Sequence, residues 1–118
     1  MKKVIHPIKP IYNNDSKILI LGSFPSVKSR AENFYYAHPQ NRFYQVLEIV
    51  FNDKIHDKTE FLLKHHIALW DVIKSCEIEG SSDASIKNVK VNDIAKIIKE
   101  TKITKIYING KKAYSLYQ

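Results

Sequence analysis

The feature that most constrains the fold is a short apolar run followed by a long aromatic loop. Residues 18–21 are continuously apolar and Gly22 ends the run, which is typical of a strand covered on both faces in a parallel sheet. The next helical periodicity begins at Phe43, and the intervening loop of about twenty residues has a length typical of functional or disordered segments. The loop is rich in rings and amides: Phe24, Phe34, Tyr35, Tyr36, His38 and Asn41. Disordered segments are poor in aromatics, so we expect this loop to be folded and to form a ligand site.

Two further buried strands are expected over residues 67–73 and 103–108. Alternation of strands and helices predicts βαβ units, a parallel sheet and right-handed crossovers, and therefore an α/β fold. We expect residues 1–16 to form an extended lead-in, because they contain two prolines. The polar residues 74–87 are expected to form a second long loop. The length of the chain fits a single domain.

Three helices are expected between the strands. The first begins near Phe43 and has apolar residues at helical spacing that should point inward: Phe43, Val46, Leu47, Val50 and Phe51. The second follows Asp57, which has Glu60 three residues on as in a capping box. The third is expected to be capped by Asn92.

Charge and composition restrict the partners. The net charge is +7, and residues 87–112 hold eight lysines against two acidic residues. This excess indicates either a polyanionic partner, most often nucleic acid, or a solvated lysine-rich surface. The single Cys76 cannot form an internal disulfide or a four-thiolate metal site, and we expect it to be buried. Without a long apolar run or a leader pattern, the chain is expected to be cytoplasmic and to have no membrane partner.

Several polar residues fall at the carboxyl ends of the predicted strands, where open parallel sheets bind ligands. Neither a Walker pattern nor a G-x-G-x-x-G motif is present. Aromatic rings and an amide such as Asn41 are instead the groups that hold an unpaired nucleobase. Other roles stay open: the aromatics can be ordinary core, Asn41 can be a helix N-cap, and Asn109 can belong to a turn. Asp71 is either a site carboxylate or, as we favour, a buried anchor that binds backbone amides.

Two segments of the chain resemble motifs of a known family. Residues 22–26, GSFPS, resemble G-S-[MF]-P-[GS], and residues 35–43, YYAHPQNRF, resemble Y-Y-x-[HN]-P-x-N-x-F-[WY]. Both motifs are those of the hypoxanthine-DNA (DNA-deoxyinosine) glycosylase branch of the uracil-DNA glycosylase superfamily. Residues 68–83 are similar to a second conserved region of that branch. Mismatch-specific uracil glycosylases share the A-H-P-x-N-R-F-W part but carry Asn where this chain has Phe24, which favours the hypoxanthine branch.

The resemblance implies a three-layer α/β/α sandwich on a parallel sheet of order 2-1-3-4. The first and third strands would then be neighbours, with Asn109 beside Gly22 and Ser23. Family members continue to a fourth strand and a loop resembling L-P-S-T-S-P-A, which is missing here. We therefore expect residues 1–118 to be a single, C-terminally incomplete domain.

The resemblance also implies roles for individual residues. Asn41 would be catalytic, Tyr36 would stack on the flipped base, and Gly22 and Ser23 would bring backbone amides close to base and sugar. The remaining base- or sugar-binding residues would be Phe24, Pro25, His38 and Asn109. The implied reaction is hydrolysis of the N-glycosidic bond of deoxyinosine, and of deoxyuridine as a second substrate, in double-stranded DNA without a metal or cofactor. The alternatives are a non-catalytic nucleic-acid-binding or inactive fragment of this fold and a mismatch-specific uracil-DNA glycosylase.

Overall fold

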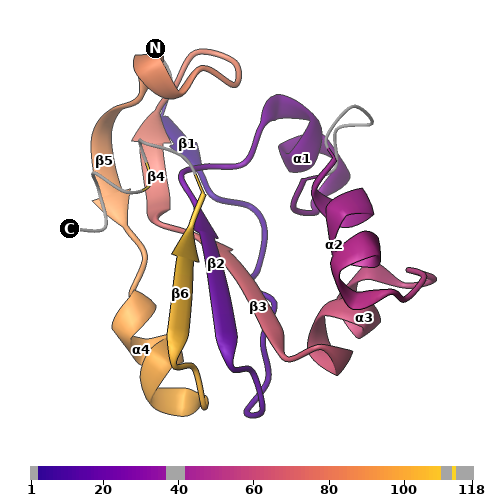
Figure 1. The fold of residues 1–118 in the computed structure, drawn as a ribbon. Helices are drawn as coiled ribbons and strands as arrows, with labels where there is room; N and C mark the ends of the chain where they lie inside the picture. The colour runs from indigo at the N-terminus through magenta and orange to yellow at the C-terminus, as the bar shows by residue number, and fades with distance from the viewer. Residues whose placement is uncertain (1–2, 37–41, 110–112, 114–118) are drawn as a thin grey trace.

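The computed structural model describes residues 3–36, 42–109 and 113 and contains both strands and helices (Figure 1). The strands are β1 (Lys3–Ile5), β2 (Ile18–Gly22), β3 (Ile67–Asp71), β4 (Ile73–Glu77), β5 (Lys87–Val91) and β6 (Lys105–Ile108). The helices are α1 (Val27–Glu32), α2 (Phe43–Phe51), α3 (Lys58–Lys64) and α4 (Ile94–Glu100), with a short 3-10 turn at Asp83–Ser85.

A parallel sheet of order β3-β2-β6 forms the centre of the molecule. Leu19 of β2 lies opposite Ala68 of β3 and Ile106 of β6. The first and third predicted strands are therefore neighbours, as expected. The central position of β2, with both edges paired and both faces covered, explains its continuous apolar run. Within residues 3–36, 42–109 and 113 there is no fourth parallel strand.

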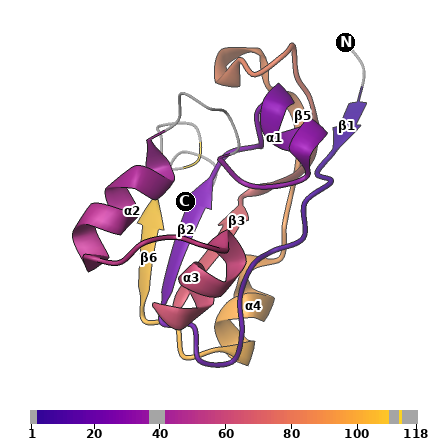
Figure 2. The same ribbon diagram turned by 90° about the vertical axis from the view of Figure 1, so that its right-hand side faces the viewer.

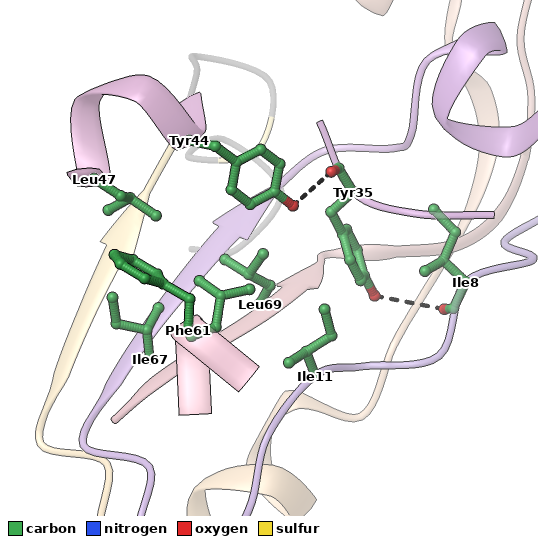
Figure 3. Close-up of a cluster of buried hydrophobic side chains, with 9 residues drawn as sticks. Ile8, Ile11, Tyr35, Tyr44, Leu47, Phe61, Ile67 and Leu69 are labelled. Atoms are coloured by element: carbon green, nitrogen blue, oxygen red, sulfur yellow. Dashed lines mark hydrogen bonds between the residues drawn. The ribbon is translucent and has the colours of Figure 1, made fainter. Parts of the chain in front are cut away.

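Helices cover both faces of this sheet. On one face, Leu47 of α2 and Phe61 of α3 belong to the same buried cluster as Leu69 of β3 (Figure 3). Figure 2 looks onto this face and shows α2 and α3 in front of the strands. On the other face, Leu19 clusters with Ile94 of α4. The predicted three-layer α/β/α arrangement is thus confirmed.

A second, antiparallel sheet of order β1-β4-β5 occupies segments that we expected to lack regular structure. Val4 of β1 lies opposite Cys76 of β4, in a region predicted as lead-in and loop. The lead-in is extended, as predicted, but its pairing as a strand was not foreseen. The loop prediction was wrong for β4, because exposed Lys74 and Ser75, which is polar yet only 4% exposed, mask its strand character. Cys76 is buried in the core beneath this sheet, as predicted.

The predicted strand 67–73 is divided between the two sheets. β3 ends at Asp71, and the next two backbone N–H groups still donate to the end of β2 and the residue after it: Val72 to the Gly22 carbonyl at 2.8 Å and Ile73 to the Ser23 carbonyl at 3.1 Å. The chain then continues as β4. The junction therefore fixes the backbone at the carboxyl ends of β2 and β3 against each other.

The inward face of α2 differs from the prediction. Tyr44 and Leu47 are its buried residues, whereas Val46 and Val50 are 51% and 67% exposed. The helix is rotated because Tyr44 points inward, where its hydroxyl donates to the Tyr35 carbonyl at 2.7 Å (Figure 3). A hydroxyl with a buried partner thus overrides the apolar pattern.

Helix caps agree with the sequence in one case and not in another. The Asp57 carboxylate accepts from the Glu60 N–H at 3.0 Å, which confirms the predicted cap of α3. α4 is capped by Asp93, not Asn92. The Asn92 side chain instead donates to the Asp71 carbonyl at 2.9 Å and to the Ile73 carbonyl at 3.2 Å. It therefore supports the β3–β4 junction.

The lysines of the basic segment are spread over two parts of the molecule. Lys87 and Lys90 are exposed on β5, whereas Lys96 and Lys99 are exposed on α4, in the part of the molecule farther from the carboxyl ends of the parallel strands (Figure 1). Among the described residues, no helix has the length and apolar character needed to cross a bilayer.

Candidate active site

A cavity of about 270 Å³ lies at the carboxyl ends of β2, β3 and β6. Its wall contains six of the eight predicted site residues: Gly22, Ser23, Phe24, Pro25, Tyr36 and Asn109. The other two, His38 and Asn41, lie outside the residues that the structure describes. Four further residues complete the wall: Ser26, Ser29, Tyr35 and Asp71. The strand ends thus bring together residues from three distant parts of the sequence.

Gly22 leaves room for the Asp71 carboxylate to lie over the end of β2 at the floor of the cavity. A Cβ atom on Gly22 would lie 2.6 Å from the Asp71 Oδ1 atom and 3.5 Å from the Tyr36 hydroxyl. The first distance is far below ordinary van der Waals contact, so a side chain at position 22 would displace the Asp71 carboxylate. Gly22 is thus required here for lack of space.

Tyr36 is held in an unusual conformation beside the floor. Its φ is 54°, a left-handed value that is uncommon for a residue other than glycine and that often occurs at functional sites. Its ring stacks on Phe43 with centroids 3.9 Å apart, and its hydroxyl accepts from the Asn109 amide at 3.3 Å. Burial raises the pKa of Tyr36 to about 12, although the Asn109 bond opposes this. The group is therefore a neutral phenol at physiological pH, able to donate a hydrogen bond.

The other two aromatic residues of the cavity wall are Tyr35 and Phe24, and both are largely buried. Tyr35 is only 2% exposed and donates from its hydroxyl to the Lys9 carbonyl at 3.0 Å, so it is mainly a core residue. Burial raises the pKa of its hydroxyl. Phe24 is 8% exposed and has the Arg30 guanidinium 5.5 Å from its ring centroid. Arg30 also donates to the Gly80 carbonyl at 2.7 Å, so it fastens α1 to the loop before β5.

The loop after β2 contains a short helix that the sequence analysis missed. Ser26 caps α1, its hydroxyl accepting from the Ser29 N–H at 3.1 Å. Ser26 is the last residue of the GSFPS segment, and a serine three residues before another polar residue is a weak cap signal. The helix places two hydroxyl groups at the rim of the cavity.

Asp71 is the only charged residue among the described residues that line the cavity. It is 5% exposed, and its Oδ2 atom lies 2.7 Å from Nε2 of His6. We favoured an anchor that binds backbone amides with its carboxylate. The structure shows a buried carboxylate, as in that reading, but the partner is an imidazole.

The tautomer of His6 follows from its second contact. The Ile8 N–H donates to Nδ1 of the ring at 3.2 Å, so Nδ1 carries no hydrogen. Nε2 therefore carries the hydrogen and donates it to Asp71. His6 was not predicted as a site residue, because 65 residues separate it from Asp71 and no local pattern connects the two.

Nothing in the described part of the chain resembles a metal centre: it holds no cluster of three or more His, Cys, Asp or Glu side chains. What the cavity offers is an aromatic ring, neutral donors and one fixed carboxylate. Such a set can hold a planar polar heterocycle and can stabilise charge near it.

Comparison with known proteins identifies the family. The family model of the uracil DNA glycosylase superfamily matches residues 10–118. A hypoxanthine DNA glycosylase of Methanosarcina barkeri is 33% identical over 120 residues, which cover 96% of this chain and 74% of that protein. A hypoxanthine DNA glycosylase of Methanosarcina acetivorans is 33% identical over 109 residues, covering 87% and 69%. The solution NMR structure of a protein assigned as a uracil DNA glycosylase, also from Methanosarcina acetivorans, has a TM-score of 0.81 and 31% identity, covering 97% of this chain and 75% of that one. The chain therefore belongs to the uracil DNA glycosylase superfamily.

Proposed function

We propose that this protein is a DNA glycosylase that hydrolyses the N-glycosidic bond of deoxyinosine in double-stranded DNA and releases hypoxanthine. Both curated relatives described above are named hypoxanthine DNA glycosylases. The observation that carries the proposal is the cavity at the strand ends, whose wall contains the motif residues Gly22, Ser23 and Tyr36 together with Asn109. A cavity of about 270 Å³ is near the lower end of the range for small-molecule sites, which suits a single base.

The substrate base would leave the helix to reach this cavity. Extrusion of a base costs a few kcal/mol and is least costly at a mispair, so deaminated bases are favoured before any contact is made. In the cavity, the Tyr36 ring would lie against the base, and the Tyr36 hydroxyl and the Asn109 amide would provide neutral donors to it. Backbone groups of Gly22 and Ser23 would approach base and sugar.

Asn41 would orient the attacking water. An amide cannot deprotonate water, so its contribution would be position, together with stabilisation of the departing base by preorganised donors. Breaking the bond between C1′ and the base nitrogen leaves the electron pair on the base, and the water oxygen then bonds to C1′. The proton that the water loses ends on the base. We place the reaction in the cytoplasm, as the sequence analysis expects.

The test is base release from defined duplexes. A labelled duplex with a single deoxyinosine is incubated with the 118-residue chain and treated with alkali, which breaks the strand at the abasic site. We expect breakage with the wild-type chain and a loss of at least about a hundredfold with Asn41→Ala. Asn14→Ala is the matched control, because Asn14 is an exposed turn residue outside the cavity wall, and this variant should retain full activity.

Two results would contradict the proposal. One is salt-dependent binding to the duplex without any release of base, which would indicate a nucleic-acid-binding domain. The other is breakage at deoxyuridine alone, which would indicate a uracil glycosylase of the mismatch-specific kind.

A further inference from the structure

The carboxylate of Asp71 has no role in the reaction as described so far, although it forms part of the cavity wall. Its Oδ1 atom lies above Gly22, 2.6 Å from the position a Cβ would take there. The Tyr36 hydroxyl lies 3.5 Å from the same position. The one charged side chain among the described wall residues is therefore close to the phenol that would face the substrate.

We propose that Asp71 stabilises the positive charge that develops on deoxyribose as the glycosidic bond breaks, and that His6 is the residue that positions it. This inference rests on the proposed function. The carboxylate would face the sugar rather than the base, because the base leaves with the bonding electrons and a second negative charge would repel it. The neutral donors Tyr36 and Asn109 would face the base.

The hydrogen bonds around Asp71 fix the carboxylate before substrate arrives. His6 donates from Nε2 to Oδ2 at 2.7 Å, and the Ile8 N–H holds the other side of the imidazole. The Asp71 carbonyl accepts from the Asn92 amide at 2.9 Å. Asp71 is thus restrained on its side chain and on its backbone, which is the condition for electrostatic stabilisation without reorganisation.

Burial makes the charge effective. Only 6% of the Asp71 side chain and 4% of the His6 side chain are exposed. Water therefore screens the carboxylate weakly, and a cation within about 4–6 Å would be stabilised by on the order of 10- to 100-fold in rate or affinity. His6 supplies a hydrogen bond from a neutral ring, so it does not cancel the negative charge.

The test compares two abasic analogues in the same duplex. One carries a neutral tetrahydrofuran ring and the other a protonated pyrrolidine, which imitates the cationic sugar. The wild-type chain should bind the pyrrolidine duplex at least about tenfold more tightly than the tetrahydrofuran duplex. Asp71→Asn, which keeps the shape and an acceptor for His6, should abolish most of this preference while retaining affinity for tetrahydrofuran. It should also slow single-turnover release of hypoxanthine by about 10- to 100-fold.

The chain offers a matched control and a rescue. Asp53 also accepts from a histidine, His65, at 3.0 Å, but it is not part of the cavity wall, so Asp53→Asn should leave the preference unchanged. His6→Leu should reduce the preference, and His6→Gln, which retains an N–H donor, should restore part of it. A purely structural role for His6 would lower thermal stability in both variants without separating the two analogues.

Each outcome decides the inference. Equal affinity of the wild-type chain for the two duplexes would overturn it, even if Asp71→Asn does not fold. A folded Asp71→Asn variant with an unchanged preference would also overturn it, while base release by the wild-type chain would leave the proposed function intact. Absence of both base release and analogue binding in the wild-type chain would overturn the two together.

Discussion

Gly22→Ala tests the contact between position 22 and the Asp71 carboxylate at the floor of the cavity. The new Cβ would lie 2.6 Å from Asp71 Oδ1, and an ordinary contact begins near 3.4 Å, so the carboxylate has to move by about 0.8 Å. Such overpacking typically costs about 1–3 kcal/mol of unfolding free energy. The φ of Gly22 is not left-handed, so Ala can adopt the native backbone conformation. The unfolded Ala variant has less conformational freedom, which would offset about 0.4–1 kcal/mol of the loss in unfolding free energy. We expect a net loss of about 1–2 kcal/mol.

The same displacement should lower activity more than stability. A misplacement of about 1 Å in an active site can cost about a hundredfold in rate, so we expect hypoxanthine release to slow by about 10- to 100-fold. Stability is measured by urea unfolding and activity by single-turnover cleavage of the deoxyinosine duplex. Gly80→Ala is the control, because Gly80 has a φ of 59° and a Cβ there would have no atom within 4 Å. This variant should lose about 1–2 kcal/mol of unfolding free energy through backbone strain alone and should leave the rate of hypoxanthine release unchanged.

A double-mutant cycle identifies the cause. In an Asp71→Ala background the obstructing carboxylate is absent, so Gly22→Ala should lose most of its cost in unfolding free energy. An equal cost in both backgrounds would show that the contact with Asp71 is not what excludes a side chain at position 22, and the reasoning would be refuted.

Two further predictions concern the pH dependence of stability and the salt dependence of DNA binding. Burial raises the pKa of Tyr36 from 10.0 to about 12, so the unfolded chain loses the Tyr36 proton at a lower pH than the folded chain. The free energy of unfolding should therefore fall by about 2–3 kcal/mol between pH 10 and pH 12. Urea unfolding across this pH range measures the fall, and Tyr36→Phe should remove the part of it that comes from Tyr36. Lys87 and Lys90 on β5 are expected to contact phosphates, so changing both to Gln should reduce the slope of log affinity against log salt by about 1–2, whereas Lys96→Gln with Lys99→Gln should have little effect. An equal change in slope for both pairs of lysines would contradict the expectation that Lys87 and Lys90 are the ones that contact phosphates.

The parts of the fold that the sequence predicts are those with local causes. The run at residues 18–21 predicts a central buried strand because a strand that is paired on both edges and covered on both faces has no polar side. The cap at Asp57 is predicted because the carboxylate and the N–H that it binds are three residues apart. The order of the three parallel strands followed from the family resemblance, and the pairing of β2 with both β3 and β6 bears it out.

The parts that the sequence does not predict depend on contacts between distant segments. β1 is three residues long and pairs with β4, which lies some seventy positions later, so neither strand has a local pattern strong enough to be recognised. The rotation of α2 depends on the hydroxyl of Tyr44 reaching the Tyr35 carbonyl, which hydrophobic periodicity does not describe. The cap assigned to Asn92 was wrong because Asp93, the next residue, has an equivalent side chain and Asn92 binds two carbonyl groups across the sheet junction.

These distant contacts connect the N-terminal segment to the candidate active site. β1 pairs with β4 through Val4 and Cys76, and this pairing places His6 directly after β1 beside the end of β3. The backbone N–H of His6 donates to the Lys74 carbonyl at 2.8 Å. This bond sets the position of the residue whose imidazole binds Asp71. A segment expected to be only a lead-in therefore determines where the single carboxylate among the described wall residues points. The antiparallel sheet thus holds His6, and through His6 the Asp71 carboxylate, in position at the floor of the cavity. The strand that His6 depends on is β4, whose polar residues kept it from being predicted as a strand.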